Sequence, residues 1–308
     1  MATEKKKTVI IVAGPTAVGK TAVAIQLARH FNTQIISADS RQCFKELDIG
    51  VARPTPQDLE AAKHHFIGSH SIRDHVNAVV FEQYALNIAN ELFQDQHIVV
   101  MVGGTGLYIK AFCEGLDDIP AVKAEIRNEI SLNYEKKGLA WLVEQIMEKD
   151  PEFYKVGEIQ NPQRMMRALE VIESTGQSVL SFRKGKKAQR DFRIIKTGLE
   201  LPKEQLTQNI NSRADKMIEQ GLVNEVKGLQ NFYKLNALQT VGYTEIFEYL
   251  SGKIALSEAV RNIKTNTRQY AKRQMTWFKK DKEITWVNAN QTGAIVSMAQ
   301  KLVQAEKE

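Results

Sequence analysis

The sequence is poor in cysteine and contains no long apolar run. Its 308 residues include only two cysteines, Cys43 and Cys113, too few for a disulfide framework or for a zinc site built from paired cysteines. No apolar stretch reaches the ~18 residues of a membrane-spanning helix, and residues 1–7 lead into an apolar run too short for a signal-peptide core. We therefore expect a protein of the reducing cytoplasm with no membrane partner.

The charge is moderately basic and unevenly distributed. The formal net charge is +6, and residues 261–282 contain eight lysines and arginines against a single acid, Asp281. Aromatic residues, among them Tyr270 and Trp277, are interleaved with these cations. Such a helix is typical of surfaces that contact a nucleic-acid backbone, but a solvated helix face has the same composition, and charge alone leaves both interpretations open.

Short apolar segments alternate with helix-type sequence along the chain. Five of them lack polar alternation and indicate strands buried on both faces, at residues 9–13, 34–38, 97–102, 192–201 and 284–287. Helical periodicity occupies residues 20–31 and 77–94, between the first three of these segments. The alternation predicts an α/β fold with a doubly wound parallel sheet flanked by helices.

The pattern changes after Pro120, where only helix-type sequence follows until about Arg190. We therefore expect two domains, an α/β core of residues 1–118 and 191–308 and an inserted all-helical domain of residues 119–190. In the second half of the core, continuous helices are predicted at residues 203–230 and 242–281, before a last strand and a closing helix.

The most specific local motif follows the first predicted strand. The segment Gly14-Pro15-Thr16-Ala17-Val18-Gly19-Lys20-Thr21 fits G-x-x-x-x-G-K-[ST] at every fixed position. In such a loop the backbone N–H groups face an anion, the lysine adds a point charge, and the Thr21 hydroxyl is a ligand for Mg²⁺. The motif predicts a P-loop NTPase-like core that binds a di- or triphosphate, and it leaves open which one.

Two other predicted strands end in polar or glycine-rich turns, Asp39-Ser40-Arg41-Gln42 and Gly103-Gly104-Thr105-Gly106-Leu107-Tyr108. Ligands of open α/β sheets bind beyond the carboxyl ends of the strands, so both turns are expected beside the phosphate loop. Asp39 and Thr105 have an alternative interpretation as helix caps. The adjacent His64 and His65 lack further ligands nearby, which favours a structural role over a metal site.

Together these motifs resemble one family, the tRNA dimethylallyltransferases, also called tRNA isopentenyltransferases. Besides the phosphate loop and the two turns, the resemblance rests on Asp48-Ile49-Gly50, Arg53-Pro54, His64-His65, Gln163-Arg164 with Arg167, Arg213 with Met217, Gly221-Leu222-Val223, Gly242-Tyr243-Thr244-Glu245 and residues 267–278. This ordered set covers most of the chain. The chain departs from the family pattern at Arg53, where lysine is usual, at Arg41, where methionine is frequent, and at Gly68, where the family tends to have aspartate.

The resemblance implies transfer of a dimethylallyl group from dimethylallyl diphosphate to N6 of adenosine 37 in the tRNA anticodon loop. It implies that the phosphate loop, Arg213 and Mg²⁺ at Thr21 stabilise the leaving diphosphate, that Asp39 removes a proton, and that Thr105 positions the amine or the diphosphate. The expected partner is the anticodon stem-loop, and the expected oligomeric state is a monomer. The RNA contacts implied are Asp39, Ser40, Arg41, Gln42, Thr105, Arg127, Gln163, Arg164, Met165, Met166, Arg167, Arg268, Lys272 and Arg273.

Three other functions would use parts of the same sequence. A P-loop kinase would share the sheet and the helical insertion, although Val102 here leads to glycine where an ordinary ATPase ends its strand in a metal-holding aspartate. A prenyltransferase for free adenine nucleotides would share the leaving-group chemistry, and a binding module would need only the loop and the basic helix. The long basic helix and the large insertion favour a polymeric acceptor.

Overall fold

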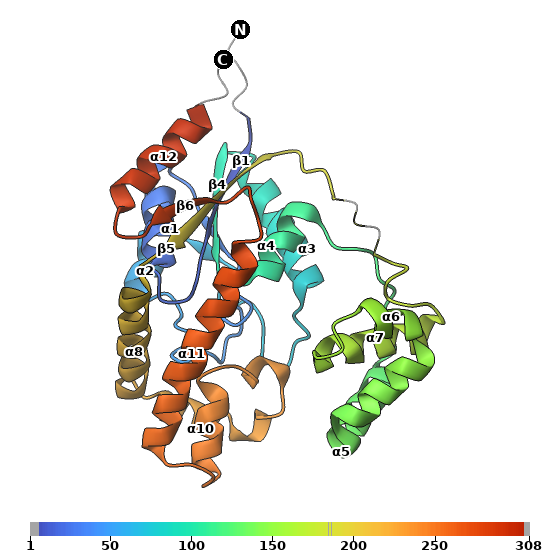
Figure 1. Ribbon diagram of the computed structural model, residues 1–308. Helices are drawn as coiled ribbons and strands as arrows, with labels where there is room; N and C mark the ends of the chain where they lie inside the picture. Colours follow the sequence, from blue (N-terminus) through green and yellow to red (C-terminus); the bar gives the residue numbers. More distant parts are fainter. Residues whose placement is uncertain (1–5, 184, 186, 305–308) are drawn as a thin grey trace. The chain divides into compact units, whose positions relative to one another are not determined.

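The computed structural model describes residues 6–183, 185 and 187–304, and the chain forms two compact units (Figure 1). The core unit consists of Met1–Glu114 and Gln189–Glu308, and the helical unit of Gly115–Ala188. The domain boundaries expected from the sequence, after residues 118 and 190, lie a few residues C-terminal to these divisions. Each unit has an apolar core of its own.

A six-stranded parallel sheet, ordered β3-β2-β4-β1-β5-β6, forms the centre of the core unit. The strands are β1 (Thr8–Ala13), β2 (Ile35–Ser37), β3 (His64–His65), β4 (Ile98–Gly103), β5 (Arg193–Glu200) and β6 (Thr285–Asn288). The predicted parallel sheet is confirmed, and the edge strand β3 is an addition that the sequence did not indicate. Because the strands share one direction, the carboxyl ends of β1, β2 and β4 meet at one edge of the sheet.

The sheet is buried on both faces. In β1, Val9 and Ile11 belong to an apolar cluster with α3 (Ala78–Leu92), α4 (Gly106–Glu114) and α11 (Leu256–Phe278). Ile10 and Val12 belong to a second cluster with α1 (Lys20–His30) and α12 (Thr292–Gln304). Alternate residues of a strand point to opposite faces, so burial of both faces explains the continuous apolar runs.

Two helices predicted as continuous are each divided at a glycine in the left-handed region. Residues 203–230 form α8 (Lys203–Glu219) and α9 (Leu222–Gly228), divided at Gly221 with φ +99°. Residues 242–281 form α10 (Tyr243–Leu250) and α11, divided near Gly252 with φ +76°. The prediction was wrong here because glycine at positive φ ends a helix even where the apolar periodicity continues. The remaining short helices of this unit are α2 (Pro56–Ala61), η1 (Gln230–Phe232) and η2 (Asn236–Leu238).

The helical unit contains α5 (Ala124–Lys149), α6 (Pro151–Val156) and α7 (Pro162–Thr175). Gly138, at φ +73°, interrupts α5. The core of this unit includes fully buried side chains such as Leu142, Ile146 and Met165. In neither unit does a helix within the described residues have the length and apolar character that crossing a bilayer requires.

Candidate active site

The phosphate loop connects β1 to α1, and glycines give it its shape. Gly14 has φ +146°, and a Cβ atom there would lie 2.7 Å from the carbonyl oxygen of Leu199, so a larger residue does not fit. Gly19, at φ +98°, precedes α1 without a side-chain cap. The N–H groups in the first turn of α1 therefore remain available to an anion, which the positive end of the helix dipole also favours.

Two cationic side chains converge on this loop. Lys20 Nζ donates to the carbonyl oxygen of Pro15 at 2.8 Å, and Arg213 Nη1 donates to Thr16 Oγ1 at 3.2 Å. Burial, together with the nearby Arg213 guanidinium, lowers the pKa of Lys20 to about 7, although the Asp39 carboxylate acts in the opposite direction. Burial also lowers the pKa of Arg213. Two like charges held close together are stabilised by a bound polyanion, as in a diphosphate site.

Asp39 begins a tight turn after β2 and lines the same small cavity as Thr16 and Arg213. Its Oδ1 accepts hydrogen bonds from the N–H groups of Arg41 at 2.9 Å and Gln42 at 3.3 Å, so the carboxylate caps this turn and not a helix. Among the described residues, its hydrogen bonds all use Oδ1. Oδ2 therefore remains available to a substrate proton.

Thr105 connects the turn after β4 to the turn after β2. Its hydroxyl accepts from the Ser40 N–H at 3.0 Å and donates to Ser40 Oγ at 3.3 Å, while its own N–H donates to the carbonyl oxygen of Ala38 at 3.2 Å. A Cβ atom on Gly103 would overlap Ala38, which explains why glycine stands where the end of β4 lies against the end of β2. The hydroxyl thus orients the Asp39 turn.

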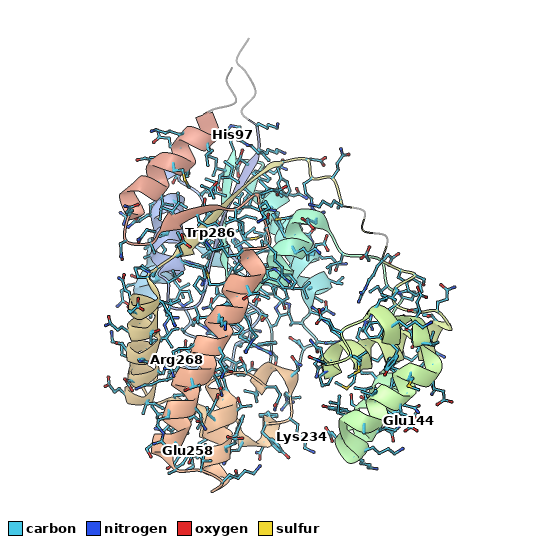
Figure 2. All side chains as sticks on the ribbon, in the orientation of Figure 1. His97, Glu144, Lys234, Glu258, Arg268 and Trp286 are labelled. Carbon is cyan, nitrogen blue, oxygen red and sulfur yellow. The ribbon has the colours of Figure 1, made fainter. Side chains whose placement is uncertain are left out.

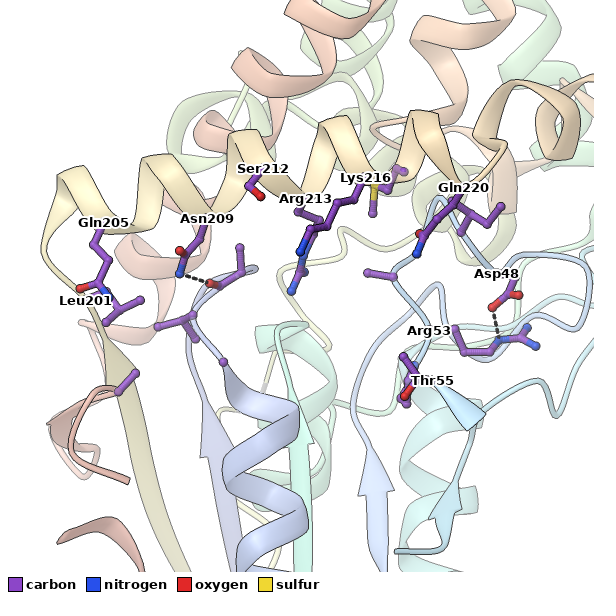
Figure 3. A pocket seen from close by; sticks show the side chains of 18 of the residues that line it. Asp48, Arg53, Thr55, Leu201, Gln205, Asn209, Ser212, Arg213, Lys216 and Gln220 are labelled. Carbon is purple, nitrogen blue, oxygen red and sulfur yellow. Dashed lines mark hydrogen bonds and ion pairs between the residues drawn. The ribbon is translucent and has the colours of Figure 1, made fainter. Parts of the chain in front are cut away.

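Two cavities border the phosphate loop. The smaller, about 120 Å³, has polar lining residues that include Thr16, Asp39, Arg41 and Arg213 and apolar ones that include Val51, Ile210, Ala214, Met217, Val241 and Ile263. The larger, about 720 Å³, lies along α8, from which Arg213 projects into it (Figure 3). Asn209, also on α8, donates to the carbonyl oxygen of Ala17 at 3.1 Å. Because Arg213 and Met217 line both cavities, a ligand at Arg213 can extend into either one.

The two adjacent histidines form strand β3 at the edge of the sheet, and both side chains have polar partners in the core unit. His64 Nδ1 lies 2.8 Å from the carbonyl oxygen of Ala62, and His65 Nε2 lies 2.7 Å from Gln34 Oε1. Burial lowers the pKa of both imidazoles. Within the part of the chain that the structure describes, no group of three or more His, Cys, Asp or Glu side chains that could hold a metal ion comes together.

Two departures from the family pattern, Arg53 and Gly68, lie against each other. A Cβ atom on Gly68 would lie 3.5 Å from Arg53 Nη1. The guanidinium donates to the carbonyl oxygens of Phe44 and Leu47, each at 2.5 Å, and lies 3.8 Å from an Asp48 carboxylate oxygen. The arginine thus occupies space beside residue 68 and lies near one acid, Asp48.

The comparisons with known proteins agree on one family. A family model described as IPP transferase matches residues 42–281. The tRNA dimethylallyltransferase of Christiangramia forsetii is 49% identical over 277 residues, which are 90% of this chain and 92% of that protein. The chain belongs to the tRNA dimethylallyltransferase family. The resemblance seen in the sequence is therefore confirmed, and with it the enzyme class, a prenyltransferase.

Solved structures of tRNA dimethylallyltransferases share the whole fold. The tRNA isopentenylpyrophosphate transferase of Bacillus halodurans is 30% identical, with a TM-score of 0.72 over 97% of this chain and 98% of that chain. A eukaryotic dimethylallyltransferase, solved acting on tRNA, is 25% identical, with a TM-score of 0.79 over 97% of this chain and 80% of that chain. Similarity over such lengths covers both the core unit and the helical unit.

The RNA contacts expected of a tRNA dimethylallyltransferase on α11 include both exposed and internally bonded side chains. Lys272 and Arg273 are exposed, and the Arg273 guanidinium lies 5.9 Å from the centre of the Tyr270 ring. Arg268, labelled on α11 in Figure 2, donates from Nη1 to Asn211 Oδ1 of α8 at 2.9 Å. Lys272 and Arg273 are therefore open to solvent, whereas Arg268 connects two helices.

Arg41 and Gln42 are bonded within the core unit. Arg41 Nη1 donates to the carbonyl oxygen of Asn236 at 2.8 Å, and burial lowers the pKa of its guanidinium. Gln42 Nε2 donates to the carbonyl oxygens of Ala52 at 2.9 Å and Val51 at 3.3 Å. The Gln42 amide thus supports the wall of the small cavity.

In the helical unit, a buried carboxylate organises two of the expected RNA contacts. Glu170 is 8% exposed, and its two oxygens lie 3.6 Å from Arg127 Nε and 3.3 Å from Arg167 Nη1. Arg164 forms an ion pair with Glu158 at the surface. Arg127 and Arg167 are thereby held near one another on the same unit.

Met165 and Met166 require a correction. Both were expected among the residues that contact RNA, but Met165 is fully buried and Met166 is 8% exposed in the core of the helical unit. Of the expected set 163–167, Gln163 and Arg164 are exposed and Arg167 is half-buried. The reason is helical periodicity, since two adjacent apolar residues on α7 face the unit's interior while their polar neighbours face outward.

The sequence did not predict a hydrogen-bond network that lies beside the small cavity. Glu225 of α9 accepts from the N–H groups of Ile49 at 2.7 Å and Gly50 at 3.1 Å, and from the Tyr243 hydroxyl at 2.5 Å. A Cβ atom on Gly50 would overlap the Tyr243 ring, and burial raises the Tyr243 pKa. Because Gly50 lines the small cavity, this network shapes its wall. Only the family motifs Asp48-Ile49-Gly50 and Gly242-Tyr243 hinted at it.

Proposed function

We propose that this enzyme transfers a dimethylallyl group from dimethylallyl diphosphate to N6 of adenosine 37 in the tRNA anticodon loop and releases diphosphate. One observation carries the proposal: the Asp39 carboxylate, Thr16 of the phosphate loop and the Arg213 guanidinium line one small cavity whose other walls are mainly apolar. Family membership supplies the reaction class. We further propose that it acts as a monomer in the cytoplasm.

The phosphate loop is suited to stabilising the leaving group. Breaking the allylic C–O bond leaves its electron pair on diphosphate, so cations and N–H donors must surround the departing oxygens. Lys20, Arg213 and the first turn of α1 supply them. The larger cavity beside Arg213 gives the diphosphate room and a route to solvent.

A magnesium ion fits this site. Thr21 is half-buried in the first turn of α1, and in the described part of the chain its hydroxyl has no protein partner. Mg²⁺ is commonly held by one or two protein oxygens together with substrate phosphates and water, so one hydroxyl beside the diphosphate is a suitable donor set. We propose that Thr21 holds the ion, which would neutralise charge on the diphosphate.

Asp39 is suited to be the general base. As the new bond between N6 and the first carbon of the donor forms, N6 must lose a proton, and a carboxylate within hydrogen-bond reach accepts it. Two backbone N–H groups hold Asp39 Oδ1, so Oδ2 is the atom that takes the proton. Thr105 orients the turn that carries this carboxylate.

The acceptor must be unstacked before it can react. The exocyclic amine of an adenosine in an anticodon loop is enclosed by neighbouring bases, so the base has to be extruded into the protein. We propose that Ser40 and Arg41 contact the loop beside the cavity. The other expected contacts are phosphate-binding cations, namely Arg127, Arg164, Arg167, Lys272 and Arg273, together with Gln163 and Arg268.

The test is isotope transfer. The protein is incubated with Mg²⁺, dimethylallyl diphosphate labelled in the prenyl group, and either tRNA carrying adenosine 37 or free adenine nucleotides. We expect label in tRNA, located at adenosine 37 by nuclease digestion and mass spectrometry, and a control tRNA with guanosine 37 should stay unlabelled. Label in free nucleotides, or no transfer at all, would overturn the proposal in favour of the alternative acceptor, a kinase or a binding module.

A further inference from the structure

The glycine-rich turn after β4 lies directly against α11. A Cβ atom on Gly104 would overlap the side-chain amide of Gln274, and one on Gly106 would overlap the Trp277 ring. The turn therefore needs glycine because a helix from near the end of the chain is packed onto it. Of the two α11 side chains involved, Gln274 is buried, with 6% exposure, whereas Trp277 is partly exposed.

The Gln274 amide joins two elements that are distant in the sequence. Its Oε1 accepts from the N–H of Thr16 in the phosphate loop at 2.8 Å, and its Nε2 donates to the carbonyl oxygen of Gly104 at 2.9 Å. A single planar group thus uses its acceptor on one loop and a donor on the other. Because the amide is buried, loss of either bond would leave a backbone group without a partner.

Each end of the Gln274 bridge is bonded to a loop that carries or contacts residues of the proposed active site. At one end, Thr16 also accepts from Arg213, which faces the leaving diphosphate. At the other end, Gly104 precedes Thr105, which bonds the Ser40 N–H in the turn that begins at Asp39. The bridge therefore connects the half of the site that binds diphosphate to the half that removes the proton.

We propose that Gln274 is a positioning residue that sets the separation between the phosphate loop and the Asp39 turn. The inference rests on the proposed function, because alkyl transfer requires N6, the reacting carbon and the leaving oxygen to lie in line. A shift of about 1 Å between two such groups can lower a rate about 100-fold. Gln274 acts through the loops and touches neither substrate.

The first test replaces the amide by an apolar group of similar length, Gln274→Met. We expect the single-turnover rate of dimethylallyl transfer to fall about 100-fold per folded enzyme, while KM for tRNA changes less than about twofold. The folded fraction is measured by circular dichroism. The matched control is Gln26→Met, at an exposed position on α1, which should leave both values unchanged.

The second test uses the pH profile of Gln274→Glu. An ionised carboxylate can accept from Thr16 but cannot donate to the Gly104 carbonyl, whereas the protonated acid can do both. Burial beside the Gly104 carbonyl oxygen favours the protonated form, and the Arg213 guanidinium bonded to Thr16 acts in the opposite direction. The ratio of variant to wild-type rate should therefore rise at least fivefold as the pH falls from 8 to 6, which general damage to the fold would not produce.

The outcomes separate the two proposals. If wild-type enzyme transfers no label to tRNA, the proposed function fails. If wild-type enzyme is active but Gln274→Met retains more than about a third of its single-turnover rate, or the ratio for Gln274→Glu does not change with pH, the positioning role of Gln274 fails and the proposed function stands.

Discussion

Binding of the diphosphate donor should depend on pH through Lys20. In the free enzyme the pKa of Lys20 lies at about 7, because burial and Arg213 disfavour its charged form. A bound diphosphate places negative charge beside the amine and raises that pKa, so the ligand binds the protonated enzyme and binding above pH 7 takes up a proton. Affinity should therefore fall as the pH rises.

The size of the effect follows from the fraction of protonated Lys20. Between pH 7 and 8.5 that fraction falls from about one half to about 3%, so affinity should fall about 15-fold if the bound pKa exceeds about 9. The terminal phosphate of the donor ionises near pH 6, below this window. Titration of the ligand should therefore contribute little to the change.

The assay is isothermal titration calorimetry with an unreactive thio-analogue of dimethylallyl diphosphate. Repeating each titration in two buffers of different ionisation enthalpy counts the protons taken up, which should approach one at pH 8.5. Lys20→Arg should make the affinity for the analogue nearly independent of pH, because an arginine does not titrate in this range. Lys110→Arg, at an exposed position on α4, is the matched control and should retain the wild-type dependence of affinity on pH. An affinity independent of pH, with no proton uptake, would refute the reasoning.

Three further outcomes are expected. Asp39→Asn keeps an acceptor for the backbone N–H groups, so tRNA binding should persist while the single-turnover rate falls at least about 100-fold. Combined Arg164→Ala and Arg167→Ala should raise KM for tRNA and reduce the slope of log K against log salt by about 1.4–1.8, at about 0.7–0.9 per phosphate contact, and an unchanged slope would mean that neither meets phosphate. Tyr243→Phe removes a hydrogen bond to the Glu225 carboxylate and should lower the free energy of unfolding in urea by about 1.5–3 kcal/mol. Unchanged stability would contradict that network.

Local sequence predicted the parts of the site that depend on backbone shape. A phosphate loop is encoded by glycines at fixed spacing between a strand and a helix, and the structure has such a loop between β1 and α1. The strands were predictable because a parallel sheet buried on both faces leaves continuous apolar runs. The turns at Asp39 and Thr105 follow strand ends, and in a parallel sheet these ends lie at one edge.

The helices were predicted less well, because apolar periodicity continues through a break. Gly221 and Gly252 end helices by adopting positive φ, which the pattern of apolar residues does not reveal. Met165 and Met166 were grouped with exposed neighbours by their place in a motif. Their burial depends on which face of α7 packs inward.

The sequence by itself determined the phosphate loop, the parallel sheet and the family, since each is written in contiguous residues or in an ordered set of motifs. Only the tertiary structure decided which distant side chains complete the site. Arg213 and Gln274 both bond Thr16, although 197 and 258 residues separate them from it. The physical reason is that local patterns specify backbone conformation and the buried face of an element, whereas the partner of a polar group on that face depends on how the helices pack across the sheet.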